Sequence, residues 1–301
     1  MKLTADCIVC NLKAAVMAIR ELTTEETIMR ELVEEIMQIP AMRGLDWSIT
    51  GSQLVEQIIN RIGNAAGSRD PFQRRKEKQN KRCLELYPRL KSLVDSSQDS
   101  LFVAVNLAIS GNSMDPMGYL SWQDLEKEIQ RILENPVPRS NFMDLKDGLE
   151  QSRLAIYLGD NCGEIVFDKL LIETIKAQRD IDVAFVVRSV PTLNDATLAD
   201  AQFVGMSDTT TVMENGIDGP LPGTILSRCS EQMQRLWSDA DLVISKGGGN
   251  FDSLDEQKNI TTPIFYMLMC KCVPYSNYFN IPLNSPILSR ALSTAEGAGK
   301  A

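Results

Sequence analysis

The hydrophobic positions divide the chain into two parts with different periodicities. From residue 4 to about residue 150, apolar side chains recur at three- and four-residue steps, as at Ile28, Leu32 and Ile36. This is the spacing of an amphipathic helix, whereas the period-two alternation of a half-buried strand is nearly absent. We therefore expect residues 1–150 to form an all-helical N-terminal domain.

Turn and capping residues set limits to individual helices in this part. Asp70-Pro71 is typical of an N-cap followed by the first helical residue. The basic helix that follows is expected to start at Phe72 and to end or kink near Tyr87, because Pro88 comes next. A separate apolar run over 101–109 ends at Gly111-Asn112.

From residue 154 onward, short runs that are apolar throughout alternate with helical patterns. Four such runs are predicted strands: Leu154–Leu158, Val183–Val187, Asp241–Ser245 and Pro263–Met269. Buried strands that alternate with helices are typical of a parallel sheet covered on both faces. Residues 151–301 thus predict an α/β fold, a Rossmann-like three-layer domain with a mostly parallel sheet. The small, polar tail at 293–301 is expected to be disordered.

Polar residues and glycines follow three of the predicted strands. In an open parallel sheet, ligands bind beyond the carboxyl ends of the strands, so these segments should converge. They are Gly159–Glu164 with Asp160 and Asn161, then Arg188 with Asn194-Asp195, and then Lys246 with Gly247, Gly248, Gly249 and Asn250. Singly, each segment also fits a turn or a helix cap, but all three at carboxyl strand ends favour a site.

The residue types in these segments indicate a metal next to an anion site. Asp160, Asn161 and Asp195 offer oxygen ligands, which suit Mg²⁺ or Mn²⁺. Lys246 and the glycines after it offer a cation and a run of accessible N–H groups for a phosphate, and a helix after Asn250 would add its positive end. The combination is typical of phosphoryl chemistry.

Four further residues are candidates with weaker support. Glu164 could assist the ligands or act as a general acid or base, and Arg188 could bind substrate. Asn112 and Asp115 follow an apolar helix and could reach the site from the helical part, although helix capping explains them as well.

Composition mainly excludes classes of protein. The 301 residues include no histidine, so neither a histidine base nor a histidine-bound metal is available. A net charge of −9 argues against general nucleic-acid binding. No apolar stretch reaches the roughly 18 residues of a membrane span, and the N-terminal segment lacks the pattern of a signal peptide, so we expect a cytoplasmic protein. The sequence does not indicate an oligomeric state.

Seven cysteines include two close pairs, Cys7-x-x-Cys10 and Cys270-x-Cys272. A four-cysteine metal site is one interpretation of them, and buried reduced thiols are the other.

Several of these segments also resemble one known family. Gly159-Asp-Asn-Cys-Gly-Glu-Ile-Val-Phe-Asp168 is similar to the hallmark of the DUF89 family of metal-dependent damage-control phosphatases. The remaining similarities, in chain order, are Cys7-x-x-Cys10, Asp70-Pro71-Phe72 with Lys76 and Asn80, Gly111-Asn112-x-x-Asp115, Asn194–Thr197 with Asp200-Ala201, Asn215-Gly216, Pro222–Thr224 and Lys246–Asn250. The N-terminal pair is similar to the prokaryotic branch of that family.

The resemblance implies a helical domain packed on an α/β domain and a divalent cation, with Mn²⁺, Co²⁺, Ni²⁺ or Mg²⁺ as candidates. It implies Asp160, Asn161 and Asp195 as metal ligands and Lys246 as the phosphate-binding lysine. The implied reaction is hydrolysis of small phosphate monoesters, such as sugar phosphates and phosphopantetheine derivatives. Ser189-Val190-Pro191, Gly248 and Cys272-Val273-Pro274 depart from the usual pattern and bear mainly on substrate identity.

Two other functions and one mechanistic choice stay open. A SAM-dependent methyltransferase also places an acidic residue after its first strand, but it normally has a richer glycine motif there. A non-catalytic protein that binds phosphorylated metabolites needs the anion site alone. The attacking group is either water, which we favour, or one of the two aspartates, Asp160 or Asp195.

Overall fold

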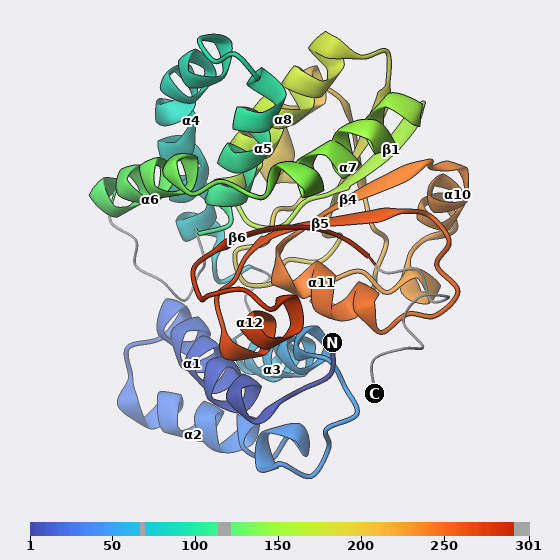
Figure 1. Cartoon of the computed structure of the whole chain (residues 1–301). Helices are drawn as coiled ribbons and strands as arrows, with labels where there is room; N and C mark the ends of the chain where they lie inside the picture. Colours follow the sequence, from blue (N-terminus) through green and yellow to red (C-terminus); the bar gives the residue numbers. More distant parts are fainter. Residues whose placement is uncertain (67–69, 114–121, 292–301) are drawn as a thin grey trace.

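The computed structural model describes residues 1–66, 70–113 and 122–291 (Figure 1). The predicted tail at 293–301 and Asp115 lie outside the described residues. The first seven helices are α1 (Ala5–Leu22), α2 (Glu26–Ile36), α3 (Gly51–Ala66), α4 (Gln73–Asp95), α5 (Ser100–Gly111), α6 (Trp122–Glu134) and α7 (Arg139–Gln151). The next five are α8 (Glu164–Gln178), α9 (Leu198–Phe203), α10 (Glu231–Asp239), α11 (Gly247–Asp255) and α12 (Val273–Phe279). Short 3₁₀ turns lie at Ala41–Arg43, Met206–Asp208 and Leu226–Arg228.

In the described part of the chain, six strands form one sheet in the order β3-β2-β1-β4-β5-β6. Their bounds are β1 (Leu154–Leu158), β2 (Asp182–Val187), β3 (Thr211–Glu214), β4 (Leu242–Lys246), β5 (Ile264–Met269) and β6 (Pro286–Arg290). All neighbours pair in parallel except β5 and β6. The chain leaves β1 in one direction to β2 and β3 and returns on its other side to β4 and β5. This reversal between β1 and β4 creates the crevice in which open α/β sheets bind ligands.

Helices cover both faces of the sheet, as the apolar strands require. One face packs against α4, α5, α7 and α8, with Tyr157 and Phe185 among its buried residues. The other face packs against α10, α11 and α12, where the Phe251 ring makes an edge contact with Tyr266. The predicted three-layer α/β architecture with a mostly parallel sheet is confirmed.

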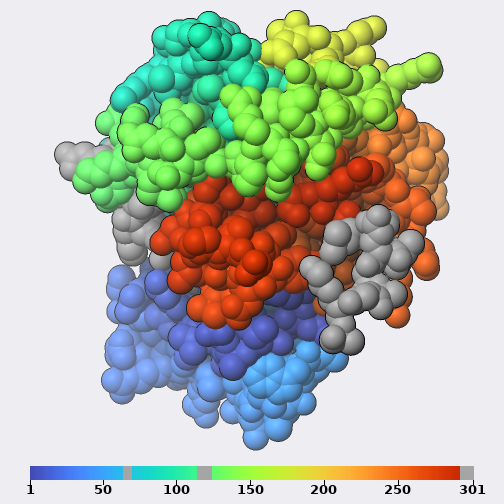
Figure 2. All heavy atoms as spheres, in the orientation of Figure 1, coloured from blue at the N-terminus to red at the C-terminus, as the bar shows by residue number. Residues whose placement is uncertain are grey.

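The helical part contributes to two different hydrophobic clusters. Helices α1–α3 form a cluster of their own, whereas residues of α4–α7 share a cluster with the sheet. Helix α5 explains this division, because nearly all its residues are buried and an all-round apolar helix needs partners on every side. The expected boundary at residue 150 therefore does not separate two cores. Figures 1 and 2 show α1–α3 as a lobe at one end, with α12 between it and the sheet.

Three element predictions are corrected by the structure. Helix α4 continues through Pro88 to Asp95 instead of ending near Tyr87. An internal proline costs about 3 kcal/mol, but the face carrying Cys83, Leu90 and Val94 stays buried along the whole helix, and this packing offsets the cost. Strands β3 and β6 were not expected. Both lie at sheet edges, where partial exposure removes the continuous apolar signal.

Among the described helices, none combines the length and apolar character needed to cross a bilayer.

Candidate functional site

The loop after β1 places Asp160 and Asn161 at the carboxyl edge of the sheet. Strand β1 ends at Leu158, and Gly163, with φ of 79°, turns the chain into α8. Side chains with a Cβ rarely adopt this φ, so glycine permits the sharp entry into the helix. Asp160 and Asn161 are consequently held in the short turn, where both are buried.

The loop after β2 lies edge to edge with the loop after β1. Asn161 and Asp195 form an isolated antiparallel bridge. The Ala196 N–H also donates to the Asp160 carbonyl over 2.8 Å. The structure thus brings together the three predicted metal ligands, which come from two separate segments of the sequence.

Hydrogen bonds orient the amide of Asn161. Its Nδ2 donates to Asp160 Oδ2 at 2.6 Å and to Glu164 Oε2 at 2.9 Å. Asn112 Nδ2 donates to the same two carboxylates at 3.1 to 3.2 Å, while its Oδ1 accepts from the Met269 N–H. With Nδ2 on the carboxylates, the Asn161 Oδ1 points away from them and is the atom available to a cation.

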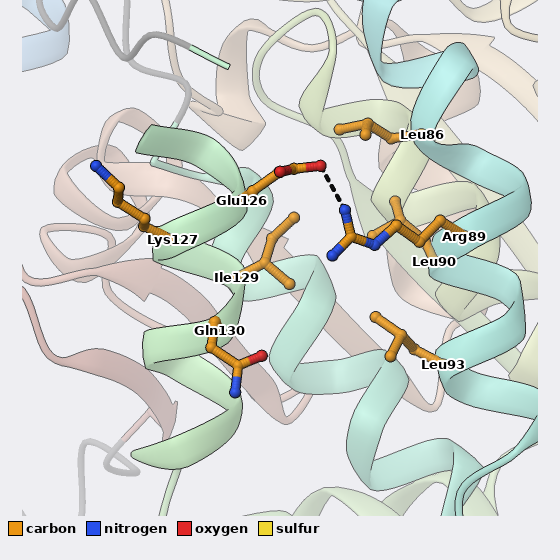
Figure 3. A pocket seen from close by; sticks show the side chains of 8 residues that line it. All are labelled: Leu86, Arg89, Leu90, Leu93, Glu126, Lys127, Ile129 and Gln130. Atoms are coloured by element: carbon orange, nitrogen blue, oxygen red, sulfur yellow. Dashed lines mark hydrogen bonds and ion pairs between the residues drawn. The ribbon is translucent and has the colours of Figure 1, made fainter. Parts of the chain in front are cut away.

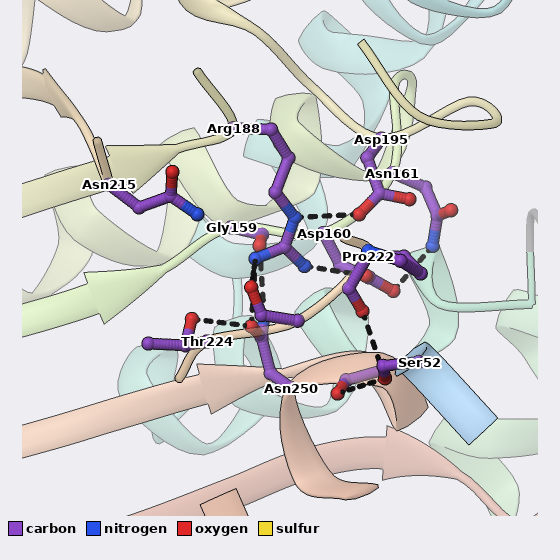
Figure 4. A network of polar contacts seen from close by, with 12 residues as sticks. Ser52, Gly159, Asp160, Asn161, Arg188, Asp195, Asn215, Pro222, Thr224 and Asn250 are labelled. Atoms are coloured by element: carbon purple, nitrogen blue, oxygen red, sulfur yellow. Dashed lines mark hydrogen bonds and ion pairs between the residues drawn. The ribbon is translucent and has the colours of Figure 1, made fainter. Parts of the chain in front are cut away.

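Arg188 joins the two aspartates (Figure 4). Its Nε donates to Asp195 Oδ2 at 2.7 Å, and one terminal nitrogen donates to Gly223 O and to Asn250 Oδ1. The other terminal nitrogen lies 3.6 Å from Asp160 Oδ1 and, although buried, has no hydrogen-bond acceptor. Arg188 therefore has one buried terminal nitrogen beside Asp160 that is not used in a hydrogen bond.

Negative charge is crowded at this point. Burial raises the pKa of Asp160 well above its ordinary value, and neighbouring Asp195 and Glu164 raise it further, although Arg188 opposes them. Burial also raises the pKa of Asp195, against the effect of Arg188. A buried cluster of carboxylates is favourable only when cations compensate it.

Lys246 does not face an open cleft. It is fully buried, and its Nζ bonds Glu164 Oε1 at 2.7 Å, Asp168 Oδ1 at 2.5 Å and the Ala108 carbonyl at 2.8 Å. All three donors of the ammonium are thus matched by acceptors within the protein. In this structure Lys246 neutralises Glu164, and its predicted contact with phosphate stays a prediction.

The glycine run forms the first turn of α11, so this helix begins before Asn250 and not after it, which corrects the expectation. Gly247 has φ of 76°, and a Cβ there would lie 1.9 Å from Asp160 Oδ2. The first turn of α11 therefore lies against the Asp160 carboxylate, which turns the positive end of the helix toward the site.

The faces of the next two glycines are already covered. A Cβ on Gly248 would lie 2.3 Å from the Tyr275 hydroxyl, and one on Gly249 would lie 1.8 Å from the Pro222 carbonyl. Asn250 Nδ2 donates to Gly159 O and to Lys246 O, while its Oδ1 accepts from Arg188 and Thr224. The Asn250 amide is thus fully used by contacts within the protein, one of them with Arg188. Substrate contacts of residues 247–250 stay predictions.

The donor set suits an oxygen-bound divalent cation. Two aspartates and one asparagine lie close together where excess negative charge is buried, and a bound cation would neutralise that charge. Over the described residues, no three cysteine or acidic side chains by themselves form a metal-binding group. The four-cysteine interpretation is therefore not supported, and none of the seven cysteines, all within the described residues, forms a disulfide.

The sequence reasoning missed some residues around this site. Asp168 pairs with Lys246, and Tyr157 donates to the same Asp168 oxygen, Oδ1, at 2.7 Å. Asp168 lies one helical turn beyond Glu164, so an i, i+4 search from that residue points to it. Lys271 follows the carboxyl end of β5 and acts electrostatically on Asp160, so the strand-end rule applied to a fourth strand would have included it.

A surface groove of about 460 Å³ lies elsewhere, between α4 and α6 (Figure 3). It is lined by Leu86, Arg89, Leu90, Leu93, Glu126, Lys127, Ile129 and Gln130, and an Arg89–Glu126 ion pair spans it. None of the predicted site residues lines this groove.

Comparisons with known proteins extend over nearly the whole chain. Residues 3–285 match the family described as the damage-control phosphatase ARMT1-like domain. An uncharacterised protein of Methanocaldococcus jannaschii is 31% identical over 303 residues, which covers 96% of this chain and 95% of that protein. A damage-control phosphatase of Archaeoglobus fulgidus is 28% identical, covering 91% of this chain and 94% of its own.

A solved structure agrees with the fold. The crystal structure of a DUF89 family protein from Pyrococcus horikoshii superposes with a TM-score of 0.85 at 25% sequence identity. The match covers 97% of this chain and 100% of that chain.

Proposed function

This chain belongs to the family of damage-control phosphatase ARMT1-like domains, and we propose that it hydrolyses small phosphate monoesters with the help of a divalent cation. Relatives named damage-control phosphatases support the phosphatase role. One structural observation carries the proposal furthest. Two buried aspartates and an oriented asparagine converge beside an arginine that keeps a buried, unmatched N–H group.

Asp160, Asn161 and Asp195 are the residues that would hold the cation, for which Mn²⁺, Co²⁺, Ni²⁺ and Mg²⁺ are candidates. When bound, such a cation supplies Lewis-acid charge to a phosphate ester. Glu164 keeps the Asn161 amide turned so that its oxygen faces away from the carboxylates. Lys246 lies 2.7 Å from Glu164 and balances its charge in a fully buried position.

Arg188 is the residue that would bind the phosphate. Its free terminal nitrogen is buried beside Asp160 and can donate to a phosphate oxygen without breaking the bonds to Asp195 and Asn250. The N-terminal turn of α11 adds backbone N–H groups next to the Asp160 carboxylate. Phosphoryl transfer depends mainly on such positioning and electrostatic stabilisation of the phosphate oxygens.

The substrate class that we propose is a small phosphorylated metabolite, such as a sugar phosphate or a phosphopantetheine derivative. The positive groups of the site are few and local, in a chain with a net charge of −9. A broad basic surface, which nucleic acid requires, is not needed for such a ligand.

The experiment uses metal-stripped protein and a panel of phosphate esters. Mn²⁺, Co²⁺, Ni²⁺ and Mg²⁺ are added back separately, and released phosphate is measured. We expect release with at least one cation, and its loss in Asp160→Ala but not in Asp180→Ala, a control at an exposed position after α8. The proposal fails if no ester is hydrolysed with any cation, or if Asp160→Ala releases phosphate at the wild-type rate. Tight binding of the esters without turnover would instead indicate a binding protein.

A further inference from the structure

A buried polar network connects α4 to the two loops that carry the predicted ligands. Lys76 is 2% exposed, and its Nζ pairs with Asp70 Oδ2 and Asp200 Oδ2, each at 2.8 Å. Asn80 lies one turn further along the same face of α4 and is 1% exposed. Its Nδ2 donates to Asp200 Oδ1 at 3.3 Å, and its Oδ1 accepts from the Gly163 N–H at 2.6 Å.

Asn80 holds the first ligand loop from behind. Gly163 precedes the first residue of α8, and its N–H belongs to a helix start whose amides have no partners within the helix. The oxygen of Asn80 satisfies that N–H, so α4 acts as a cap for α8 in place of a local side chain. This bond fixes the end of the loop in which Asp160 and Asn161 lie.

Asp200 holds the second ligand loop. It is the third residue of α9, and its carboxylate accepts from the N–H and the hydroxyl of Thr197, at 2.9 and 2.7 Å. Thr197 stands two residues after Asp195. Burial opposes the ionisation of Asp200, but Lys76 and Thr197 hold its pKa below the ordinary value. Lys76 thereby keeps Asp200 charged and able to anchor this loop.

Lys76 makes its two ion pairs in a buried position. A buried ion-pair network of this kind is a poor source of stability compared with apolar packing. The network contacts the ends of both ligand loops, so its main contribution is to hold these loops in position.

From these contacts we infer that Lys76 and Asn80 are positioning residues, which set the spacing of the Asp160–Asn161 loop relative to Asp195 and so determine the affinity for the divalent cation. The inference rests on the proposed function, because it concerns the same cation. Groups that support metal ligands from behind commonly change metal affinity about 10- to 100-fold when they are removed.

The test measures Mn²⁺ binding directly. Mn²⁺ is added to metal-stripped protein, and the ion that stays unbound is quantified by electron paramagnetic resonance. We expect Lys76→Met and Asn80→Ala to weaken binding by about tenfold or more. Lys78→Met removes the same charge from an exposed position on α4 and should bind as the wild type does. Lys76→Arg keeps the charge and should recover most of the affinity.

Unfolding of the metal-free proteins in urea separates positioning from stability. A positioning role predicts that affinity at 25 °C falls while every variant remains folded by circular dichroism. If Lys76→Met fails to fold, Asn80→Ser replaces it in the test. Its side chain is shorter but keeps a hydrogen-bonding oxygen, and this variant should still bind Mn²⁺ more weakly than the wild type. Folded Asn80→Ala and Asn80→Ser proteins with wild-type affinity would overturn the inference.

The two levels of the argument fail differently. Wild-type protein that binds Mn²⁺ and hydrolyses esters, beside variants with unchanged affinity, contradicts the positioning role alone. Wild-type protein that binds none of the four cations contradicts the proposed function and this inference together.

Discussion

The contact between α11 and the Asp160 carboxylate predicts that Gly247→Ala damages the site. Gly247 has φ of 76°, and an added Cβ would lie 1.9 Å from Asp160 Oδ2 and 2.3 Å from its Cγ. A side chain with a Cβ pays about 1–2 kcal/mol in the left-handed region. The carboxylate cannot simply swing aside, because Asn161 and Asn112 both donate to the same oxygen.

The size of the effect follows from these two contributions. Moving the carboxylate breaks at least one charge-assisted hydrogen bond, which is worth about 1.5–3 kcal/mol. Added to the backbone strain, this amounts to about 2.5–5 kcal/mol of native-state stability. Displacing a ligand should also weaken metal binding by at least the roughly 10- to 100-fold found for indirect supports.

Two measurements check this prediction, the urea midpoint of the metal-free protein and the metal concentration that half-activates phosphate release. Gly63→Ala is the matched control, because no atom beyond its neighbours and the backbone of α3 itself lies within 4 Å of its added Cβ. That change should stabilise the helix by about 0.5–1 kcal/mol and leave activation unchanged. A Gly247→Ala protein with wild-type midpoint and activation would refute the geometry of the α11 start.

Three further predictions concern pH, substrate and metal. Burial raises the pKa of Asp252 from 3.8 to about 7, so stability falls as pH rises between these values. As the pH is raised from 5 to 8, the free energy of unfolding of Asp252→Asn, measured in urea, should therefore rise relative to that of the wild type by up to about 3 kcal/mol. A difference between the two proteins that is the same at both pH values contradicts this. Arg188→Lys keeps the charge but loses the planar fork, and we expect kcat/KM for phosphate esters to fall at least about 100-fold; steady-state kinetics showing wild-type values would exclude the phosphate contact. Removing the cation with a chelator should abolish hydrolysis reversibly, and re-adding it at about 100 times its Kd should stabilise the fold by about 2.7 kcal/mol, seen as a raised Tm. Hydrolysis that persists in the chelator argues against the metal.

The α/β half of the fold was predictable because its strands are buried on both faces. Strand β1 was predicted with its observed bounds, and β2, β4 and β5 within one residue at each end. A continuous apolar run is a local property, so no knowledge of partners is needed to find it. Strands β3 and β6 are half-covered edges, and their register depends on β2 and β5, which the local pattern does not contain.

The helical half was less predictable in its limits and its packing. Pro88 has a local penalty that favours a helix end, but burial of one face of α4 along its whole length outweighs it. The division of these helices between two hydrophobic clusters also depends on which faces meet.

The site residues show the same contrast. Strand ends and residue types led to Asp160, Asn161 and Asp195, and the structure brings them together. What each side chain can do in the site depends on its contacts in the folded protein. The sequence predicted Lys246 as a phosphate-binding cation, which stays a prediction, and it did not indicate that the ammonium is enclosed between Glu164 and Asp168.

The sequence by itself therefore determined the class of chemistry. It contains no histidine, it places oxygen donors after parallel strands, and its motifs resemble one family. Only the tertiary structure decided which cations meet which carboxylates, because ion pairs between distant segments depend on the packing of whole helices and loops. Arg188 thus keeps a free donor inside the site, while Lys76, on a helix far away in the sequence, supports the loops from behind.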